Sequence, residues 1–155
     1  MIEMLVVVAV ISILSGLTLT GIGGFTSRAR DTRRIGDLRS VQNYLEAYYT
    51  KCGKYPGAAD CGGTSVTGDW SSLQAILTTS VGVNAPADPV AGRTYFYGVN
   101  TTLSNQKYIV GVKLENDNKA LDDAGELDST AGFVLTSGAA VGDCDDAANG
   151  YCVGS

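Results

Sequence analysis

The stretch Met1-Ile-Glu-Met-Leu-Val-Val-Val-Ala-Val-Ile-Ser-Ile-Leu-Ser-Gly-Leu-Thr-Leu-Thr20 decides how this chain folds. Glu3 is its one charged residue, and the next charge is Arg28, after a run of 24 uncharged residues. About 20 mainly apolar residues are enough for a helix to cross a hydrocarbon core. Residues 1–27 therefore predict a helix that must be hidden either in lipid or against other protein.

The helical pattern continues beyond this apolar segment. Apolar residues recur every three to four positions along residues 28–52, which is typical of one buried helix face. Gly53 and Pro56 then end the pattern. We expect one long helix that is apolar on all sides in its first half and amphipathic in its second. The stripe of the second half consists of Ile35, Leu38, Val41, Leu45 and Tyr48.

Four glycines, Gly16, Gly21, Gly23 and Gly24, weaken the middle of this helix. Each interior glycine costs a helix up to about 1 kcal/mol relative to alanine. One interpretation is that small residues let neighbouring helices pack closely. The other is a flexible segment that bends or unwinds when the surroundings change, and the sequence leaves both open.

The remaining residues predict a small α+β head. Residues 53–69 form a loop, and Asp69 is a candidate cap for a short helix over 70–77. Three strands are expected at 93–99, 107–115 and 132–136, with a hairpin loop at 100–106 and a tail to residue 155. A three-stranded antiparallel sheet would then pack on the amphipathic helix half. The expected organisation is a helix half at 1–27 and a head at 28–155, in which 28–52 is helical and 53–155 holds the loops and sheet.

Composition argues against nucleic-acid binding and catalysis. The net charge is −5, and residues 52–155 carry twelve acidic and five basic side chains. Nucleic-acid binding needs a basic face. Five arginines between 28 and 39 are interleaved with Asp31 and Asp37, which favours a solvated helix surface. The chain has no histidine and no evident pair of nucleophile and base, so we expect no enzyme activity.

The four cysteines form two local pairs along the sequence. Three connectivities are possible, and we favour Cys52–Cys61 with Cys144–Cys152, because each bond would close a glycine-rich loop. A zinc site is the rival, but neither pair has the close CxxC spacing. Disulfides indicate an oxidising compartment. The apolar segment lacks a basic start and a small-residue cleavage site, so we expect it to be retained.

The N-terminal stretch resembles the start of type IV pilins and type II secretion pseudopilins. Ile2-Glu3 matches the end of the family motif Phe-Thr-Leu-Ile-Glu, with Met1 where leucine is usual. Residues 28–49, the run 53–56 and Asp88-Pro89 before an aromatic strand are similar to these proteins too. Residues 57–87 and 116–155 are not covered by the resemblance.

The resemblance implies an extracellular filament made of copies of this chain. A prepilin peptidase would remove a leader and methylate the new terminus, and assembly machinery would move the helix from the inner or cytoplasmic membrane into the filament. Glu3 would pair with a neighbour's terminal amine; its alternative role is to complement the helix N-terminus. A secretion pseudopilin for protein export and a non-polymerising membrane-anchored binding domain are the alternatives. The expected core residues are Leu5, Val6, Val7, Val8, Val10, Ile11, Ile13 and Leu14.

Two weaker signals lie in the head. Acidic runs offer oxygen ligands for calcium, which related pseudopilins hold in a loop, and the candidates here are Asp117, Asp122 and Asp123. A solvated acidic loop without a cofactor is the favoured interpretation. Asn100-Thr-Thr102 matches the N-glycosylation pattern at the expected hairpin tip.

Overall fold

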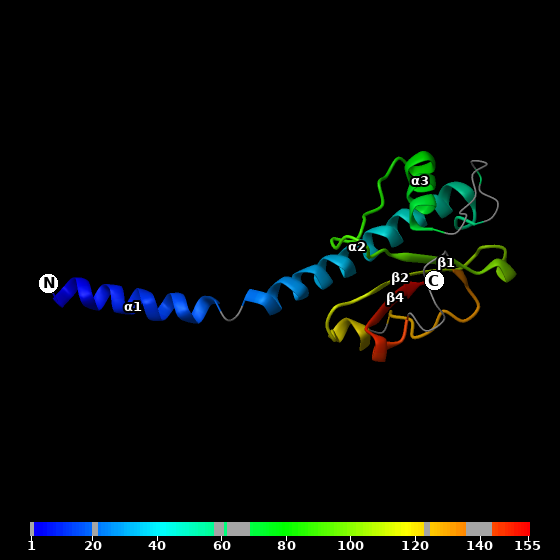
Figure 1. Cartoon of the computed structure of the whole chain (residues 1–155). Helices are drawn as coiled ribbons and strands as arrows, with labels where there is room; N and C mark the ends of the chain where they lie inside the picture. The colour runs from blue at the N-terminus through cyan, green and yellow to red at the C-terminus, as the bar shows by residue number, and fades with distance from the viewer. Residues whose placement is uncertain (1, 20–21, 58–60, 62–68, 123–124, 136–143) are drawn as a thin grey trace.

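A computed structural model describes residues 2–19, 22–57, 61, 69–122, 125–135 and 144–155. Figure 1 shows a head from which one helix, α1, projects. The helices are α1 (Ile2–Leu19), α2 (Ile22–Cys52) and α3 (Trp70–Val81). The strands are β1 (Phe96–Val99), β2 (Tyr108–Lys113), β3 (Val134–Leu135) and β4 (Gly150–Gly154), and the short 3-10 helices are η1 (Thr101–Leu103), η2 (Lys119–Asp122) and η3 (Asp146–Ala148).

The head has the α+β class that the sequence predicts, but its sheet has four strands among the described residues rather than three. The strand order is β3-β1-β2-β4, and every pairing is antiparallel. The strand that was not predicted is β4, whose residues were expected to belong to the tail. Its residues, Gly-Tyr-Cys-Val-Gly, are too few and too rich in glycine to predict a strand. Five pairs with β2 hold it in place, from Lys113↔Gly150 to Ile109↔Gly154.

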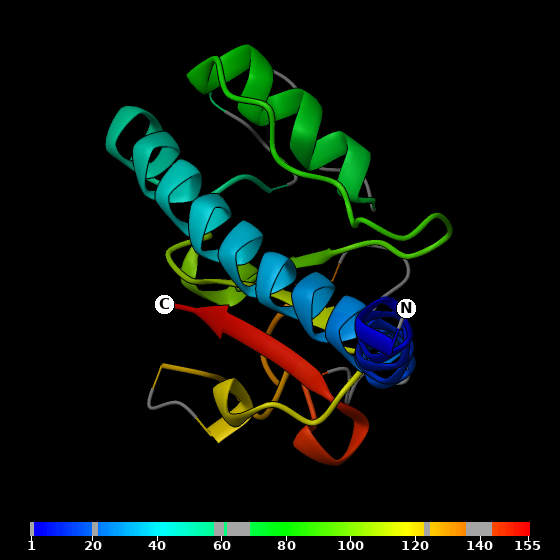
Figure 2. The ribbon, with the colours of Figure 1, turned by 90° about the vertical axis from the view of Figure 1, so that its left-hand side faces the viewer.

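The amphipathic helix half packs on one face of this sheet, as predicted. In Figure 2, α2 crosses the sheet and α3 lies beside α2. Alternate residues of β2 point toward α2, because successive side chains of a strand face opposite sides. Tyr108, Val110 and Val112 join the α2 stripe in one core, whereas Ile109 packs on the other face. In the stripe, Leu38, Val41, Leu45 and Tyr48 are fully buried.

A second, smaller core covers the opposite face of the sheet. It contains Phe96, Ile109, Cys144 and Cys152. Gly111 lies between these side chains in the middle of β2. A Cβ atom there would come within 2.2 Å of the Phe96 ring and 2.6 Å of the Cys152 sulfur. This strand position is therefore a glycine because the ring and the disulfide occupy the space of a side chain.

The expected long helix is described as two helices of 18 and 31 residues. Gly21 lies outside the described residues, and Gly23 lies within α2. Around Gly16 and Gly24, no atom of the described chain outside the neighbouring residues and the local helix backbone comes within 4 Å of an added Cβ. No contact within the described chain thus explains these two glycines, and both interpretations of the segment stay open.

Candidate assembly surface and charged clusters

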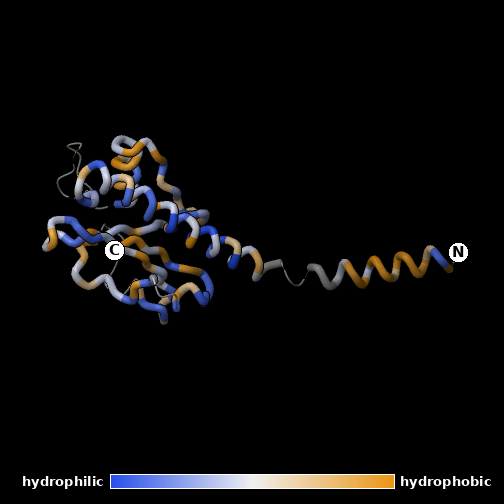
Figure 3. Tube along the Cα trace, turned by 180° about the vertical axis from the view of Figure 1, so that it is seen from behind, coloured by the Kyte–Doolittle hydropathy of each residue, from blue (hydrophilic) through white to orange (hydrophobic). Residues whose placement is uncertain are grey.

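The exposed large apolar side chains of the described residues are concentrated on α1. Every residue from Ile2 to Gly16 is exposed, and the large apolar side chains among them are 49–79 % exposed. Figure 3 shows this helix as a nearly continuous hydrophobic segment. In the rest of the described chain, the exposed large apolar residues are Phe25, Leu103 and Val134. All eight predicted core residues lie on this surface: Leu5, Val6, Val7, Val8, Val10, Ile11, Ile13 and Leu14.

This apolar surface surrounds α1 rather than forming a stripe. Residues 4–11 are apolar without interruption, and they cover two full turns of the helix. A helix that is apolar on all sides is normally buried on all sides. Among the described residues, no helix is both long and apolar enough to cross a membrane.

Glu3 is exposed in the first turn of α1 and is the only charged residue of that helix. No ion pair between described residues includes it. Both predicted roles therefore remain available to Glu3. A carboxylate in the first turn interacts favourably with the helix dipole, and the same carboxylate is free to meet a cation from another molecule.

A buried ionic network lies where α2 leaves the head. The Arg34 side chain is 0 % exposed and meets three carboxylates. Its Nε and Nη2 donate to the two Asp88 oxygens at 2.7 and 2.9 Å. Its Nη1 donates to Asp31 at 2.9 Å and to Glu115 at 2.7 Å. Arg30 also donates two hydrogen bonds to Glu115.

This network fastens two loops to α2. Asp31 accepts hydrogen bonds from the backbone N–H groups of Glu115 and Asn116, and Asp88 accepts one from Val90 N–H. Hydrogen bonds from Arg30 and Arg34 lower the pKa of Glu115 to about 2. Burial acts to raise the pKa of Asp88, but hydrogen bonds from Arg34 and Val90 outweigh it, so that this pKa is lowered.

The alternation of arginines with Asp31 and Asp37 predicted a solvated surface for all five arginines, and this prediction is wrong for Arg34. The sequence did contain a signal for the burial of Arg34, because positions 31 and 34 continue the spacing of the buried stripe at 38, 41, 45 and 48. Arg30 is partly buried, and Arg28, Arg33 and Arg39 are exposed, as predicted. The partners of Arg34 could not be inferred, since Asp88 and Glu115 lie 54 and 81 residues away.

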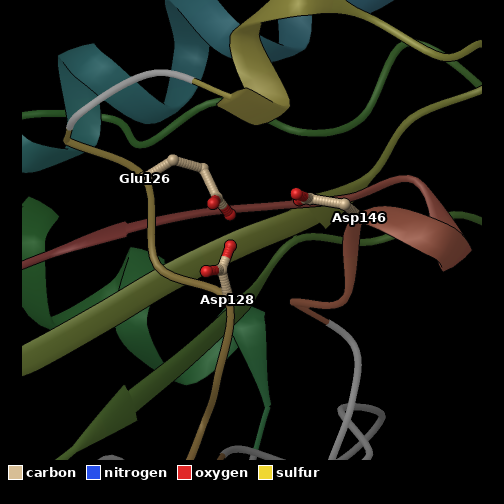
Figure 4. A group of neighbouring side chains, drawn as sticks. All are labelled: Glu126, Asp128 and Asp146. Atoms are coloured by element: carbon tan, nitrogen blue, oxygen red, sulfur yellow. The ribbon is translucent and has the colours of Figure 1, made fainter.

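Three carboxylates gather beside β4, as Figure 4 shows. Glu126, Asp128 and Asp146 place carboxylate oxygens within 4.8 Å of one another. Burial, together with a hydrogen bond to Asp128, raises the pKa of Glu126 to about 7. Burial and the negative charge of Asp128 also raise the pKa of Asp146. Oxygen ligands of this kind suit calcium, which takes six to eight of them.

Two of the three predicted calcium ligands do not belong to this group. Asp117 and Asp122 are exposed and lie outside it, and Asp123 lies outside the described residues. The acidic runs thus indicated the chemistry, but not which carboxylates the fold brings together. Glu126 joins the group because a β-bridge pairs its backbone with Val153. Such a contact leaves no pattern in the sequence.

Asn100 stands at the start of the hairpin between β1 and β2, as predicted. It caps η1, and its side-chain oxygen accepts a hydrogen bond from Leu103 N–H at 3.0 Å. The side chain is half-buried. Glycosylation at this site stays a prediction.

Both predicted disulfides form. Cys52–Cys61 closes the loop after α2, and Cys144–Cys152 joins the segment before η3 to β4. Cys144 and Cys152 are fully buried, and this second bond therefore also builds the smaller core.

Comparison with known proteins gives no match: no family model, no curated protein and no solved structure is similar to this chain. A functional assignment therefore depends on the residues and on the geometry described above.

Proposed function

We propose that this chain is the structural subunit, or major pilin, of an extracellular type IV pilus-like filament. The observation that carries the proposal is the apolar surface of α1, which is exposed on all sides while the head completes its own core. Exposed apolar patches of this extent mark sites of protein or membrane interaction. In the filament, the α1 helices of many copies would form a common core, and the heads would form the outer surface.

The energetics favour a polymer over a dimer. Full burial of one large aliphatic side chain contributes about 1.5–3 kcal/mol. Ten such side chains on α1 are about half to four-fifths exposed. Their burial would therefore contribute on the order of 10 kcal/mol per subunit before the entropy of association is subtracted. One partner helix covers only one side of α1, so a core of several helices buries more apolar surface, and gains more free energy, than a pair of helices does.

Glu3 would determine the register of this core. A charge in an apolar interior is costly unless it is paired. The N-terminal amine of a neighbouring copy is a suitable partner, and only one axial offset between copies brings the two groups together. The role involves no catalysis and no nucleic acid.

The proposal includes a route to the filament. Before assembly, the apolar segment would hold the subunit at the inner or cytoplasmic membrane, where a prepilin peptidase and the assembly machinery would act on it. The head would lie outside the cytoplasm, since its two disulfides suit an oxidising compartment. The assembled filament would stand on the cell surface.

A type II secretion pseudopilin is the second candidate. The Glu126–Asp128–Asp146 group favours it, because three converging carboxylates can contribute ligands to calcium. Calcium would then raise the unfolding temperature of the wild-type head, and Asp128→Asn would abolish this effect. Magnesium at the same concentration controls for ionic strength.

Electron microscopy of material sheared from cells, with mass spectrometry of the same fraction, tests the proposal. Long filaments containing this chain are the expected result. Recovery of the chain only from the membrane fraction would contradict the major-pilin role. A pseudopilin would then form short periplasmic filaments, whereas a membrane-anchored binding domain would form none.

A further inference from the structure

A small basic cavity opens at the end of β2, in a head that is acidic overall. Its volume is about 240 Å³, and its lining residues are Asp88, Arg93, Thr94, Val112 and Lys113. The first three belong to the connector before β1, and the other two are the last residues of β2. Two of the five carry a positive charge, although residues 52–155 contain only five basic side chains.

The carboxylate of this cavity forms no ion pair with either cation, although the charge of Arg93 helps to lower the pKa of Asp88. Asp88 lies 0 % exposed against Arg34, whose guanidinium binds both of its oxygens. Arg93 and Lys113 are exposed, and neither forms an ion pair with a described residue. Arg93 Nη1 donates to the Lys113 carbonyl at 3.3 Å, which keeps its guanidinium beside β2. The cavity therefore presents two cations without an ion-pair partner among the described residues, while the Thr94 hydroxyl donates to the Tyr95 carbonyl at 3.1 Å.

The same chain carries a complementary group. Glu126, Asp128 and Asp146 converge, and no ion pair between described residues includes any of them. Burial and the neighbouring carboxylates raise the pKa of Glu126, which is the behaviour of a carboxylate group that lacks a cation. The two charged groups consist of different residues on different segments of the head.

We propose that the cavity formed by Arg93, Thr94 and Lys113 is a docking site for the Glu126–Asp128–Asp146 carboxylates of a second copy of this chain. The inference deepens the proposed filament function and rests on it. A contact between two different patches of identical subunits is head-to-tail, and such contacts generate rings or open helical filaments. Opposite charges also offset the repulsion between acidic heads that the packing of α1 brings close together.

The contact contributes specificity more than affinity. Exposed ion pairs are weak and are screened by salt, so that the apolar α1 core supplies most of the binding free energy. The cavity then selects which neighbour is engaged and at which rotation. Added salt is therefore expected to disturb the regular rotation between neighbouring subunits more than it reduces the amount of polymer.

Cross-linking with a water-soluble carbodiimide tests the contact, because this reagent joins a lysine amine to a carboxylate without a spacer. Full-length ¹⁴N- and ¹⁵N-labelled chains are mixed, assembled and cross-linked, and the peptides are identified by mass spectrometry. We expect Lys113 to be joined to Glu126, Asp128 or Asp146 between a light and a heavy chain. Lys107, which is exposed beside the β1–β2 hairpin, is the control amine.

The outcomes separate the two proposals. Assembled material without Lys113 cross-links between chains, or with cross-links only within one chain, overturns the docking site and leaves the filament function standing. Failure of the chains to assemble at all contradicts the filament function itself. Lys113→Arg keeps the charge but removes the reactive amine, so it is expected to assemble normally and to lose the cross-link.

A charge exchange provides the second test. Lys113→Glu is expected to weaken assembly about two- to fivefold at low salt, and Lys107→Glu is the charge-matched control. Adding Asp128→Lys to Lys113→Glu recreates an opposite pair between copies and is expected to restore assembly. The docking site is refuted if Lys113→Glu assembles as the control does, or if the second exchange gives no recovery.

Discussion

Replacing Arg34 by methionine is the sharpest test of the ionic network that fastens α2 to the head. Methionine keeps most of the length of the arginine stem but removes the guanidinium from a site that is 0 % exposed. Three carboxylates then lose a partner to different degrees. Glu115 keeps Arg30, and Asp31 keeps the backbone N–H groups of residues 115 and 116. Asp88 keeps only the hydrogen bond from Val90 N–H among the described contacts.

The expected loss follows from this uncompensated charge. Removing one partner of a buried ion pair costs about 3–5 kcal/mol, because the other charge stays buried. Domains are stable by about 5–15 kcal/mol, so Arg34→Met is expected to remove about a fifth or more of the stability of the head. Asp88 carries the largest share, since its side chain is itself 0 % exposed.

Urea unfolding of the full-length chain in detergent measures this loss. The single tryptophan, Trp70, is buried against the head core and stacks edge-on with Tyr95, so its fluorescence reports on the head. Arg33→Met is the matched control, because Arg33 is 64 % exposed and lies 3.8 Å from Asp37. Its expected cost is below about 1 kcal/mol.

A second variant identifies the cause. Asp88→Asn removes the charge and keeps an oxygen for Val90 N–H, so adding it to Arg34→Met is expected to recover about half of the loss. The reasoning is refuted if Arg34→Met costs no more than Arg33→Met. It is equally refuted if neutralising Asp88 brings no recovery, since the loss would then come from packing alone.

Three further predictions concern other parts of the chain. Glu126 has a pKa raised to about 7 in the folded head, so its protonated form stabilises the fold below about pH 4.5, and this contribution is lost as the pH rises to about 7. Glu126→Gln should therefore flatten that part of the curve of unfolding free energy against pH. An unchanged curve would contradict the prediction. Gly111→Ala places a Cβ against Phe96 and Cys152 and is expected to cost about 1–3 kcal/mol in urea unfolding, whereas Gly36→Ala, with open space around it, should cost nothing. Glu3→Ala should leave the fluorescence and urea midpoint of the head unchanged but cripple filament formation seen by electron microscopy, and normal filaments would exclude the register role.

The sequence predicts those elements whose residues repeat with a clear period. The stripe on α2 is read directly from its spacing, and Asp69 does cap α3, with its carboxylate accepting from Ser72 N–H at 2.8 Å. The helix runs on to Val81, four residues past the expected end, and Gly82 closes it in a left-handed conformation. The strand β4 has no such period, because its pairing with β2 and its disulfide supply what its own residues do not.

The candidate sites divide in the same way. The apolar surface of α1 is predictable because it is local: exposure follows from a run of apolar residues that the head does not cover. The Arg34 network and the Glu126 group are not local, since each joins segments that the fold alone brings together. Acidic composition indicated oxygen-rich chemistry, but a β-bridge between Glu126 and Val153 decides which carboxylates converge.

Charges delimit the apolar segment at both ends, and this constrains how copies can stack under the proposed function. Glu3 precedes the uncharged run, and Arg28, Arg30 and Arg33 follow it. Sliding one copy along another by a helical turn would bring one of these charges into the apolar core, at a large desolvation cost. The network at Arg34 adds a second constraint, since it fixes α2 to the head where the apolar segment ends. A shift of α2 is thus a shift of the head, so that an error in register at this end of the apolar segment becomes a misplaced contact at the filament surface.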